Sequence, residues 1–408
     1  MTTVKLGDIC GFITKGATPT TYGFAWEATG VPFLRSECVS DHGLDMRQSM
    51  YISESANKVL RRSQVVKGDI LMTLTGNVGR VVLLEDLDSA NINQHIARIR
   101  ITDAAFDPGY VYHYLSQSAM REYYESIVTG QAYPQISLAQ VRATEIPKLA
   151  YDEQVRLRKS LDSADRVTYS LERLIAKKQA IKQGMMQQLL TGRTRLPGCC
   201  EKWSPVRLSD EGGTFGGLVG KTKADFDSGS ATFVTFTEVM AAPRLLGQRL
   251  ARVRVRSNER QNQVLRGDVL FNGSSETPEE VALAAVVDFE PTSTTFLNSF
   301  CFGYRLKTHD RIDPTYLAYY FRSGEGRETV FSLAQGATRY NISKTKLMNA
   351  AVILPPVDEQ REIVDVLLDS EAELSMLHVR LARARDIKTG MMQQLLTGRT
   401  RLPVEGES

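Results

Sequence analysis

Long hydrophobic runs are missing from this sequence of 408 residues. No stretch approaches the roughly 20 apolar residues of a membrane-spanning helix, and the N-terminus, MTTVKLGDIC, has no apolar signal core. The five cysteines form neither a C-x-x-C motif nor an even disulfide framework. A net charge of +3 excludes a uniformly basic nucleic-acid-binding surface but allows a local one. We therefore expect a cytoplasmic protein of two to three domains that does not associate with a membrane.

Catalytic and metal-binding motifs are also scarce. The five histidines, at positions 42, 95, 113, 309 and 378, lack metal-ligand spacing, and there is no G-x-S-x-G nucleophile elbow. The segment FGGLVGKT at 215–222 is one residue short of a phosphate-binding loop, because Phe215 stands where the first glycine belongs. A flexible basic loop carrying Lys221 and Lys223 is the better interpretation. We expect no catalytic residue, no metal site and no cofactor in this chain.

The chain does contain an internal repeat. Residues 181–197 read IKQGMMQQLLTGRTRLP and residues 387–403 read IKTGMMQQLLTGRTRLP, so sixteen of seventeen positions are identical at an offset of 206. Other matched segments are Asp152-Glu153-Gln154 with Asp358-Glu359-Gln360, Asp107-Pro108 with Asp313-Pro314, Ile136-Ser137 with Ile342-Ser343, and Gly68-Asp69-Ile70-Leu71 with Gly267-Asp268-Val269-Leu270. A repeat period near half the chain length indicates a duplicated architecture.

Both copies of the repeat predict one long helix, over 152–191 and over 358–397. Asp152 is the expected N-cap of the first helix, and Thr191-Gly192 marks its end. A stripe of mainly apolar residues follows alternating steps of four and three in the same phase in both copies, which is typical of a coiled coil. Its members are Leu157, Leu161, Ala164, Thr168, Leu171, Ile175, Lys178, Lys182, Met185 and Leu189 in the first copy, and Ile363, Leu367, Ser370, Leu374, Leu377, Leu381, Ala384, Lys388, Met391 and Leu395 in the second. The simplest partner of each helix is the other copy. Because a globular domain lets the chain return between them, we expect an antiparallel pair.

The segments before the helices predict two mixed domains of the α+β class. Short β-rich runs such as VPFLRS, GDILMTLT and FVTFTEV are separated by turn residues and followed by a helical stretch. QRLARVRVRS predicts a strand on which Arg252, Arg254 and Arg256 share one face. The expected domains are residues 1–151, a first recognition domain; 152–197, the central helix region; 198–357, a second recognition domain; and 358–408, the C-terminal helix region.

Three pairs of polar loops lie at matched positions of the two domains but differ in content. Scaffolded recognition loops behave in this way, and Asn, Gln and Arg side chains read base edges through paired hydrogen bonds. In the first domain the expected DNA-binding residues are Arg35, Ser36, Thr75, Asn77, Arg80, Asn93, Gln94, Gln131 and Tyr133. In the second they are Lys221, Lys223, Asn272, Ser274, Asn298, Thr338, Arg339 and Tyr340. Plain hairpin turns and a solvated strand face are the alternatives.

The duplicated tract also predicts a docking surface. Packing within a core does not demand that exposed-type residues be identical in both copies, whereas two copies of one partner would. The residues concerned are Gln187, Gln188 and Arg193 in the first copy and Gln393, Gln394 and Arg399 in the second. Duplication without selection is the alternative explanation.

This layout resembles the specificity subunit of type I restriction–modification systems. The resemblance is carried by the duplicated Asp-Glu-Gln and Gln-Gln-Leu-Leu-Thr-Gly segments and by the paired Gly-Asp strands, and it spans essentially the full chain. It implies that two target-recognition domains read the halves of a split, asymmetric site in double-stranded DNA. It further implies two long helices that separate the domains and dock two methyltransferase subunits.

The resemblance places all catalysis in partner subunits. The methyltransferases would use S-adenosylmethionine to methylate adenine N6, and motor–nuclease subunits would use ATP and Mg²⁺ for translocation and cleavage. A different class of function remains open, in which the coiled coil is an interaction scaffold and the domains bind proteins. Salt-dependent binding of a DNA duplex by the assembled complex distinguishes the two.

Overall fold

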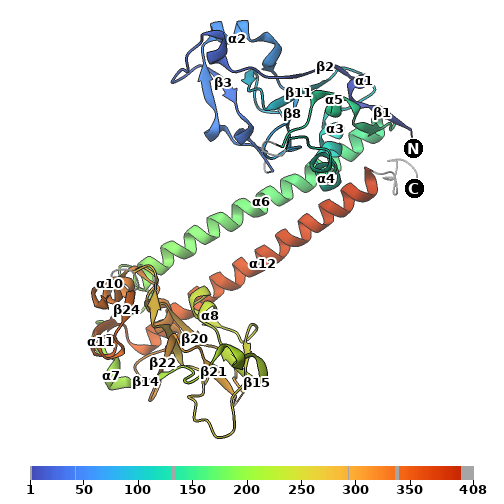
Figure 1. Ribbon diagram of the computed structural model, residues 1–408. Coiled ribbons are helices and arrows are strands. Elements are labelled where there is room, and N and C mark those ends of the chain that lie inside the picture. The colour runs from blue at the N-terminus through green and yellow to red at the C-terminus, as the bar shows by residue number, and fades with distance from the viewer. Residues whose placement is uncertain (1, 42, 131–133, 293, 336–339, 397–408) are drawn as a thin grey trace, which may run out of the picture. The chain divides into compact units, whose positions relative to one another are not determined.

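The computed structural model describes residues 2–41, 43–130, 134–292, 294–335 and 340–396 (Figure 1). Contacts between Cα atoms divide the chain into two units, residues 1–174 with 377–408, and residues 175–376. Each unit contains one domain of mixed strands and helices and a part of both long helices. No helix in the described ranges is long and apolar enough to cross a membrane.

The first domain contains two four-stranded sheets. One has the order β2-β11-β8-β9 and is antiparallel: β2 (Cys10–Lys15), β11 (Ile96–Ile101), β8 (Ile70–Thr73) and β9 (Val81–Leu83). The other has the order β6-β3-β10-β7: β6 (Met50–Ile52), β3 (Val31–Leu34), β10 (Ala90–Ile92) and β7 (Gln64–Val65). The remaining elements are β1 (Thr3–Lys5), β12 (Glu145–Pro147), β4 (Val39–Ser40), β5 (Gly43–Leu44), α1 (Leu6–Ile9), α2 (Glu54–Val59), α3 (Pro108–Leu115), α4 (Ser118–Ser126) and α5 (Leu138–Ala143).

The second domain has a related plan, in which the larger sheet has five strands and two smaller sheets have three strands each. Its larger sheet has the order β14-β22-β18-β20-β16: β14 (Gly212–Gly216), β22 (Cys301–Leu306), β18 (Val269–Asn272), β20 (Ala284–Val287) and β16 (Arg244–Leu245). Two smaller sheets are β17-β15-β21, which comprises β17 (Ala251–Val253), β15 (Phe226–Val234) and β21 (Thr295–Leu297), and β19-β24-β23, which comprises β19 (Ser274–Ser275), β24 (Tyr340–Ile342) and β23 (Ala334–Gln335). The remaining elements are β13 (Ser204–Arg207), β25 (Ala351–Leu354), α7 (Leu208–Glu211), α8 (Phe236–Ala241), α9 (Pro314–Tyr320), α10 (Gly324–Leu333) and α11 (Lys344–Asn349).

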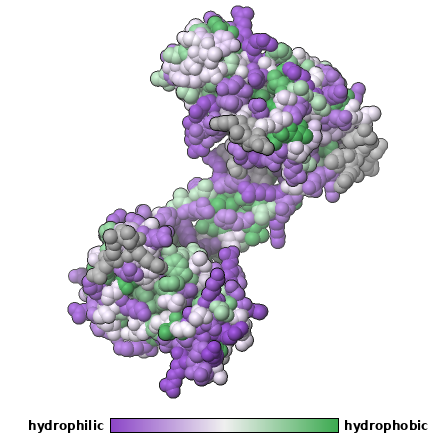
Figure 2. Space-filling model, in the orientation of Figure 1, coloured by the Kyte–Doolittle hydropathy of each residue, from purple (hydrophilic) through white to green (hydrophobic). Residues whose placement is uncertain are grey.

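Two of the expected strands in the second domain end earlier than predicted. β15 ends at Val234, because the Thr235 side chain accepts a hydrogen bond from the Glu238 amide and caps α8. β17 ends at Val253, so only Arg252 of the three alternating arginines lies in a strand. Arg252, Arg254 and Arg256 are nevertheless all exposed. On the face shown in Figure 2, hydrophilic side chains gather over the β15 region of this domain.

The repeated Asp-Pro and Ile-Ser segments are helix caps. Asp107 accepts a hydrogen bond from the Tyr110 amide at the start of α3, and Asp313 accepts one from the Tyr316 amide at the start of α9. Each is followed by proline at the first helical position, where a missing N–H costs nothing. Ser137 and Ser343 cap α5 and α11 in the same way. The repeat therefore preserves the helix starts, which orient the helices against each sheet.

The repeated Gly-Asp segments place a buried carboxylate in an ion pair with a partly exposed arginine in each domain. Asp69 is 1% exposed and accepts two hydrogen bonds of 2.6 Å from the Arg100 guanidinium. Asp268 is also 1% exposed and accepts two of 2.7 Å from Arg305. A backbone amide, of Val66 or of Leu265, bonds the same carboxylate. Because a buried carboxylate is tolerated only when it is paired and hydrogen-bonded, this motif serves the sheet.

The long helices are α6 (Tyr151–Leu189) and α12 (Val357–Leu395). The bounds lie within two residues of the prediction. Asp152 was expected as the N-cap, but it lies in the first turn because the helix begins one residue earlier. The stripe residues of both helices are buried or half-buried along their length.

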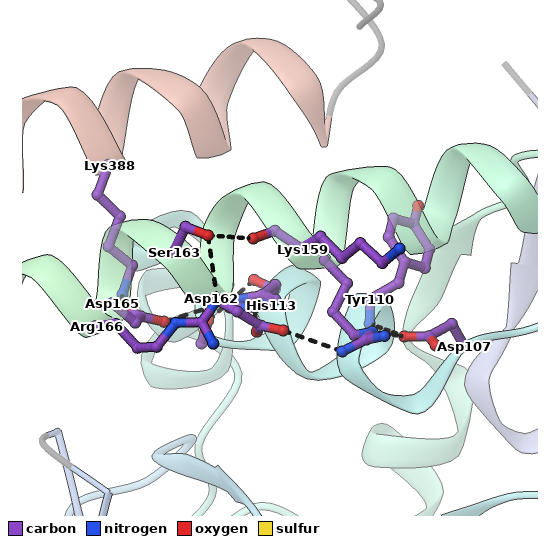
Figure 3. A network of polar contacts seen from close by, with 11 residues as sticks. Asp107, Tyr110, His113, Lys159, Asp162, Ser163, Asp165, Arg166 and Lys388 are labelled. Carbon is purple, nitrogen blue, oxygen red and sulfur yellow. Dashed lines mark hydrogen bonds and ion pairs between the residues drawn. The ribbon is translucent and has the colours of Figure 1, made fainter. Parts of the chain in front are cut away.

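In the first unit, α6 and α12 are joined by ion pairs (Figure 3). Lys388 of α12 contacts Asp165 of α6, and Arg385 contacts Glu172 at 2.7 Å. Asp165 also lies 3.9 Å from Nδ1 of His113 on α3, so the helix pair is connected to the domain. Within this unit, residues further along α12 contact residues earlier along α6.

The neighbouring carboxylate, Asp162, strengthens the connection to the domain. His113 is 1% exposed, and its Nε2 lies 2.7 Å from Asp162 Oδ1. Arg158 reaches both Asp162 and Asp107, each at 3.1 Å (Figure 3). Burial alone would raise the pKa of Asp162, but the hydrogen bond and charge of His113, together with Arg158, hold that pKa below its usual value. The carboxylate is therefore anionic at neutral pH and bridges the helix to α3.

The second unit contains an equivalent connection. Lys182 of α6 lies 2.7 Å from Glu371 of α12, and Tyr319 of α9 donates a 2.6 Å hydrogen bond to the same carboxylate oxygen. These residues match Lys388, Asp165 and His113 at the repeat offset of 206. Lys178 and Glu373 add a second pair at 2.7 Å. A lysine of one helix, a carboxylate of the other and a ring of the domain thus recur in each unit.

The duplicated tract contributes to the core of each unit. Leu189 and Leu190 belong to the core of the second unit, together with α9 and the sheet residues Phe271 and Phe302. Met392, Leu395 and Leu396 belong to the core of the first unit. Each tract therefore packs against the domain that it does not directly follow in the chain.

A buried glutamine fixes each domain to the helix behind it. Gln154 Oε1 accepts from the Asp107 amide at 2.9 Å, and its Nε2 donates to the carbonyls of Ala105 and Leu149 at 2.8 and 3.0 Å. Gln360 makes the same three bonds, with Asp313, Arg311 and Pro355 at 2.9, 2.9 and 2.8 Å. Both glutamines are 0% exposed. The Asp-Glu-Gln motif is therefore a structural clamp.

We expect Gln154→Met to destabilise the first unit strongly. The thioether fills similar space but leaves one amide and two carbonyls buried without partners, which should lower the free energy of unfolding by about 2–4 kcal/mol. Denaturant unfolding monitored by circular dichroism measures this. Gln183→Met, at an exposed position of α6, is the matched control and should be close to neutral. Equal effects of the two changes would contradict the clamp.

Candidate nucleic-acid interface

In the first domain, three polar loops meet at the backbone of Leu74. The Leu74 amide donates to the His95 carbonyl at 2.8 Å, and the Leu74 carbonyl accepts from the Ile136 amide at 3.0 Å. His95 is held in turn by a 3.1 Å bond from its amide to Asn93 Oδ1. The described residues 75–80, 93–95 and 134–136 therefore lie together where β8 ends and β11 begins.

In the second domain, the same bonds form at Gly273. Its amide donates to the Phe300 carbonyl at 2.8 Å, and its carbonyl accepts from the Ile342 amide at 3.2 Å. The Phe300 amide donates to Asn298 Oδ1 at 2.9 Å. The backbone bonds at Leu74 and Gly273 therefore form the same frame in each domain. Three loops are attached to each frame at matched positions, as the sequence predicted, while their side chains differ.

Within the first loop, Asn77 is the best-placed candidate. Its side chain is exposed at the tip between β8 and β9, and its carbonyl accepts from the Thr73 hydroxyl, which holds the tip. Thr75 is half-buried, and its hydroxyl lies 3.2 Å from His95 Nδ1. The Arg80 guanidinium is paired with Asp41 at 3.2 Å, so it must leave that carboxylate to reach a phosphate.

The second loop of the first domain is more tightly held. Asn93 is 8% exposed, so it supports the turn more than it faces solvent. Gln94 is exposed, and its Oε1 accepts a 2.6 Å hydrogen bond from the Thr18 hydroxyl.

Two further candidates of the first domain, after β3, already have partners. Arg35 is half-buried and donates to the Gln48 carbonyl at 3.1 and 3.2 Å. The Ser36 hydroxyl donates to Glu37 at 3.2 Å.

The basic loop of the second domain is less free than the sequence suggested. The Lys221 side chain is 4% exposed, contacts Glu259 and donates to the Arg254 carbonyl at 2.7 Å. A lysine in this position ties the loop to the segment after β17. Lys223 is exposed, so it is the lysine of this loop that a phosphate can reach without rearrangement.

The remaining candidates of the second domain divide by burial. Asn272 is 0% exposed and donates to the carbonyls of Ser274 and Glu280 at 3.3 and 2.8 Å, so its side chain shapes the loop. Ser274 is 7% exposed and lies in β19, which pairs with β24. Tyr340 and Asn298 are half-buried. Gln131, Tyr133, Thr338 and Arg339 lie outside the described residues.

The expected docking residues are exposed wherever the structure describes them. Gln187, Gln188, Arg193, Gln393 and Gln394 all face solvent, and Gln188 Oε1 accepts a 3.1 Å bond from the Thr194 hydroxyl. Arg399 lies outside the described residues. In each copy these glutamines directly precede two buried leucines, so one helical turn both packs inward and presents polar groups.

Two residues that the sequence analysis did not select, His95 and Phe300, lie at the centre of these loops. Each stands two residues after the asparagine that holds its backbone. In the sequence, Asn93 and Asn298 each precede the ring residue by two positions. This spacing indicates that His95 and Phe300 are equivalent, although the two residue types differ.

The described part of the domains contains no metal site, and the Cys10 and Cys301 thiols are not activated. Among the described residues, no group of three or more His, Cys, Asp and Glu side chains could hold a metal ion. Burial raises the pKa of the Cys301 thiol, beside the second-domain loops, to about 12, and that of Cys10 likewise to about 12. Both thiols are therefore protonated at neutral pH and are poor nucleophiles.

Comparison with protein-family models and with known proteins finds relatives of this chain. A model of the type I restriction modification DNA specificity domain matches residues 1–183 and 202–379. The EcoBI type I restriction enzyme specificity subunit of Escherichia coli is 22% identical over 161 residues, 40% of this chain and 34% of that protein, so this match spans about a third of that relative. The MjaX type I restriction enzyme specificity subunit of Methanocaldococcus jannaschii is 21% identical over 418 aligned positions, 98% of this chain and 93% of that protein.

Solved structures share the fold over nearly the whole chain. The HsdS subunit from Thermoanaerobacter tengcongensis matches with a TM-score of 0.51 at 18% identity, covering 98% of this chain and 97% of that one. The S subunit of a type I restriction–modification system from M. genitalium gives 0.57 at 12%, covering 97% and 95%. A chain from a structure of type I R-M complex assembly and conformational transition gives 0.61 at 17%, covering 97% of both. At these identities the likeness concerns the fold.

If the loop around Asn77 reads a base, Asn77→Ala should weaken binding of the assembled complex to its DNA site. Losing a paired amide–base contact costs about 1–3 kcal/mol, or roughly 5- to 150-fold in affinity. Gln94→Ala tests the second loop and also removes the bond to Thr18. Fluorescence anisotropy with site-containing and unrelated duplexes measures both. Only the site-specific affinity should fall, and unchanged affinity would remove that residue from the interface.

Proposed function

Because the chain belongs to the type I restriction modification DNA specificity family, we propose that it reads a bipartite, asymmetric DNA site for a methylating and cleaving complex. The observation that carries this proposal is the duplicated backbone frame at Leu74 and Gly273. The frame holds three loops in each domain with the same bonds and different side chains. Two readers of common geometry and unlike content suit a site whose halves differ in sequence.

The long helices are proposed to form an antiparallel coiled coil that separates the readers. Support comes from the stripe shared by both helices and from two ion pairs of opposite order. In one unit Lys388, late in α12, pairs with Asp165, early in α6, and in the other Glu371, early in α12, pairs with Lys182, late in α6. Charged residues inside a coiled-coil stripe specify register. The spacing of the two half-sites would then follow from helix length, at about 1.5 Å per residue.

The chain is proposed to be non-catalytic, with methylation and cleavage carried out by partner subunits. Two methyltransferase subunits would use S-adenosylmethionine, and motor–nuclease subunits would use ATP and Mg²⁺. The identical exposed glutamines of the duplicated tract support two equal docking positions, near Gln187-Gln188 and near Gln393-Gln394. A cytoplasmic location accords with these partners.

Exchange of one reading domain tests the proposal. Replacing residues 1–150 with the matching domain of a related subunit should change one half of the methylated motif and leave the other half intact. The physical reason is that each domain has its own core and its own loop frame. A long-read methylome from a host that expresses the complex gives both halves directly. A change in both halves, or in neither, would contradict two independent readers, and absence of salt-dependent DNA binding would favour a protein-interaction scaffold.

The docking proposal makes a separate prediction about stoichiometry. Two methyltransferase subunits should bind each chain, because the duplicated tract presents the same exposed residues twice. Native mass spectrometry of the reconstituted complex at saturation counts them. Gln187→Arg with Gln188→Arg should reduce occupancy to one copy, and the matched pair Gln393→Arg with Gln394→Arg should do the same. A single bound copy in the unaltered complex would overturn the docking model.

A further inference from the structure

Phe300 and His95 occupy one equivalent position in the two frames. The Phe300 amide bonds Asn298 Oδ1 at 2.9 Å, and its carbonyl accepts from the Gly273 amide at 2.8 Å. The His95 amide bonds Asn93 Oδ1 at 3.1 Å, and its carbonyl accepts from the Leu74 amide at 2.8 Å. The backbone at this position is therefore fixed in the same way, and only the side chain differs.

The two side chains present opposite chemistry. The His95 ring is half-buried, with Nδ1 3.2 Å from Thr75 Oγ1 and Nε2 3.2 Å from Gln94 Nε2. The Phe300 ring offers no hydrogen-bonding atom and is 56% exposed. The exposed part of this ring is apolar surface that a ligand could cover favourably.

A pocket beside Phe300 strengthens this contrast. It has a volume of about 660 Å³ and is lined by Asn298, Phe300, Lys223 and an apolar group of Leu218, Phe226 and Phe233. Leu218 and Phe233 are only 3% and 6% exposed, and the Phe226 and Phe233 rings pack edge to face at 5.3 Å. Its apolar lining beside the amide of Asn298 and the charge of Lys223 suits a ligand that is polar but carries an apolar group.

We propose that Phe300, with the pocket that it borders, contacts the C5-methyl group of a thymine in the half-site read by the second domain. The thymine methyl is the apolar group that bases present in the major groove, and phenylalanine is among its apolar contacts. Phe300 is therefore a specificity-determining residue. This inference rests on the proposed DNA-reading function. At the equivalent position of the first domain, the imidazole of His95 favours a hydrogen bond and no preference for the methyl group.

A coupling experiment between the phenyl ring and the methyl group tests the assignment. The second half-site is the half of the methylome motif that survives replacement of residues 1–150. Each of its thymines is replaced in turn by deoxyuridine, which lacks only the methyl group, and affinity of the complete methyltransferase complex is measured. At one position the unaltered complex should lose about fourfold, as expected for one apolar carbon removed from water. With Phe300→Ala, the same replacement should have no effect.

Two further variants separate a base contact from a structural effect. Phe300→His introduces the first-domain ring on the same backbone bonds, and it should also abolish the thymine–deoxyuridine difference. Phe331→Ala removes a phenylalanine on α10 that is 58% exposed and does not line the pocket, so it should retain the difference. Replacing thymine by deoxyuridine in the first half-site should change the affinity of the three variant complexes and of the unaltered complex by the same factor.

Three results would overturn the assignment. In the first, no thymine of the second half-site responds to loss of its methyl group. In the second, one responds equally with and without Phe300. In the third, Phe300→Ala reduces methyltransferase occupancy while leaving the thymine–deoxyuridine difference intact. In that last case the ring belongs to a protein contact. Each of these results requires a complex that still binds and methylates its motif. A complex that binds no motif would instead refute the proposed function.

Discussion

The amides of Gln154 and Gln360 decide how each domain meets the helix that follows it. Each amide satisfies one N–H and two carbonyls in a place that solvent does not reach. No apolar side chain can do this, and a shorter polar one could not span the three groups. The first turn of each long helix is therefore set by the loop before α3 or α9. The capping carboxylates of Asp107 and Asp313, the sheets and the loops at Leu74 and Gly273 are all positioned relative to that junction.

Ion pairs continue the connection between domain and helices further along α6 and α12. In each unit a lysine of one helix contacts a carboxylate of the other, and that carboxylate faces a ring of the domain, His113 or Tyr319. Half-buried pairs of this kind lose more when one partner is removed than they contribute as a pair. Their effect is to disfavour shifted alignments of the helices, in which a charge would lie opposite leucine. Apolar stripe residues supply the attraction, and these pairs select the register.

The sequence predicted the parts of the molecule that local pattern and repetition control. The stripe and the identical tails placed both helices within two residues of their bounds, and the paired loops were located because the second copy confirmed the first. Contacts between distant segments were not predictable. The sequence predicts a flexible basic loop around Lys221, but Glu259, 38 residues later, contacts this lysine. Asp69 and Asp268 were recognised as matched, yet their arginines, on other strands, were not. His95 and Phe300 were passed over because their equivalence lies in backbone bonds and not in residue type.

The frame at Leu74 and Gly273 separates stability from recognition. Most of its bonds join backbone atoms, and the side-chain acceptors, Asn93 and Asn298, are the same in both copies. The exposed side chains on the loops can therefore change without removing a bond that holds the fold. Under the proposed function, substitutions at a few exposed loop positions would change the DNA site without loss of the fold. Selection for folding acts on the bonds of the frame, so it places little constraint on these exposed loop positions.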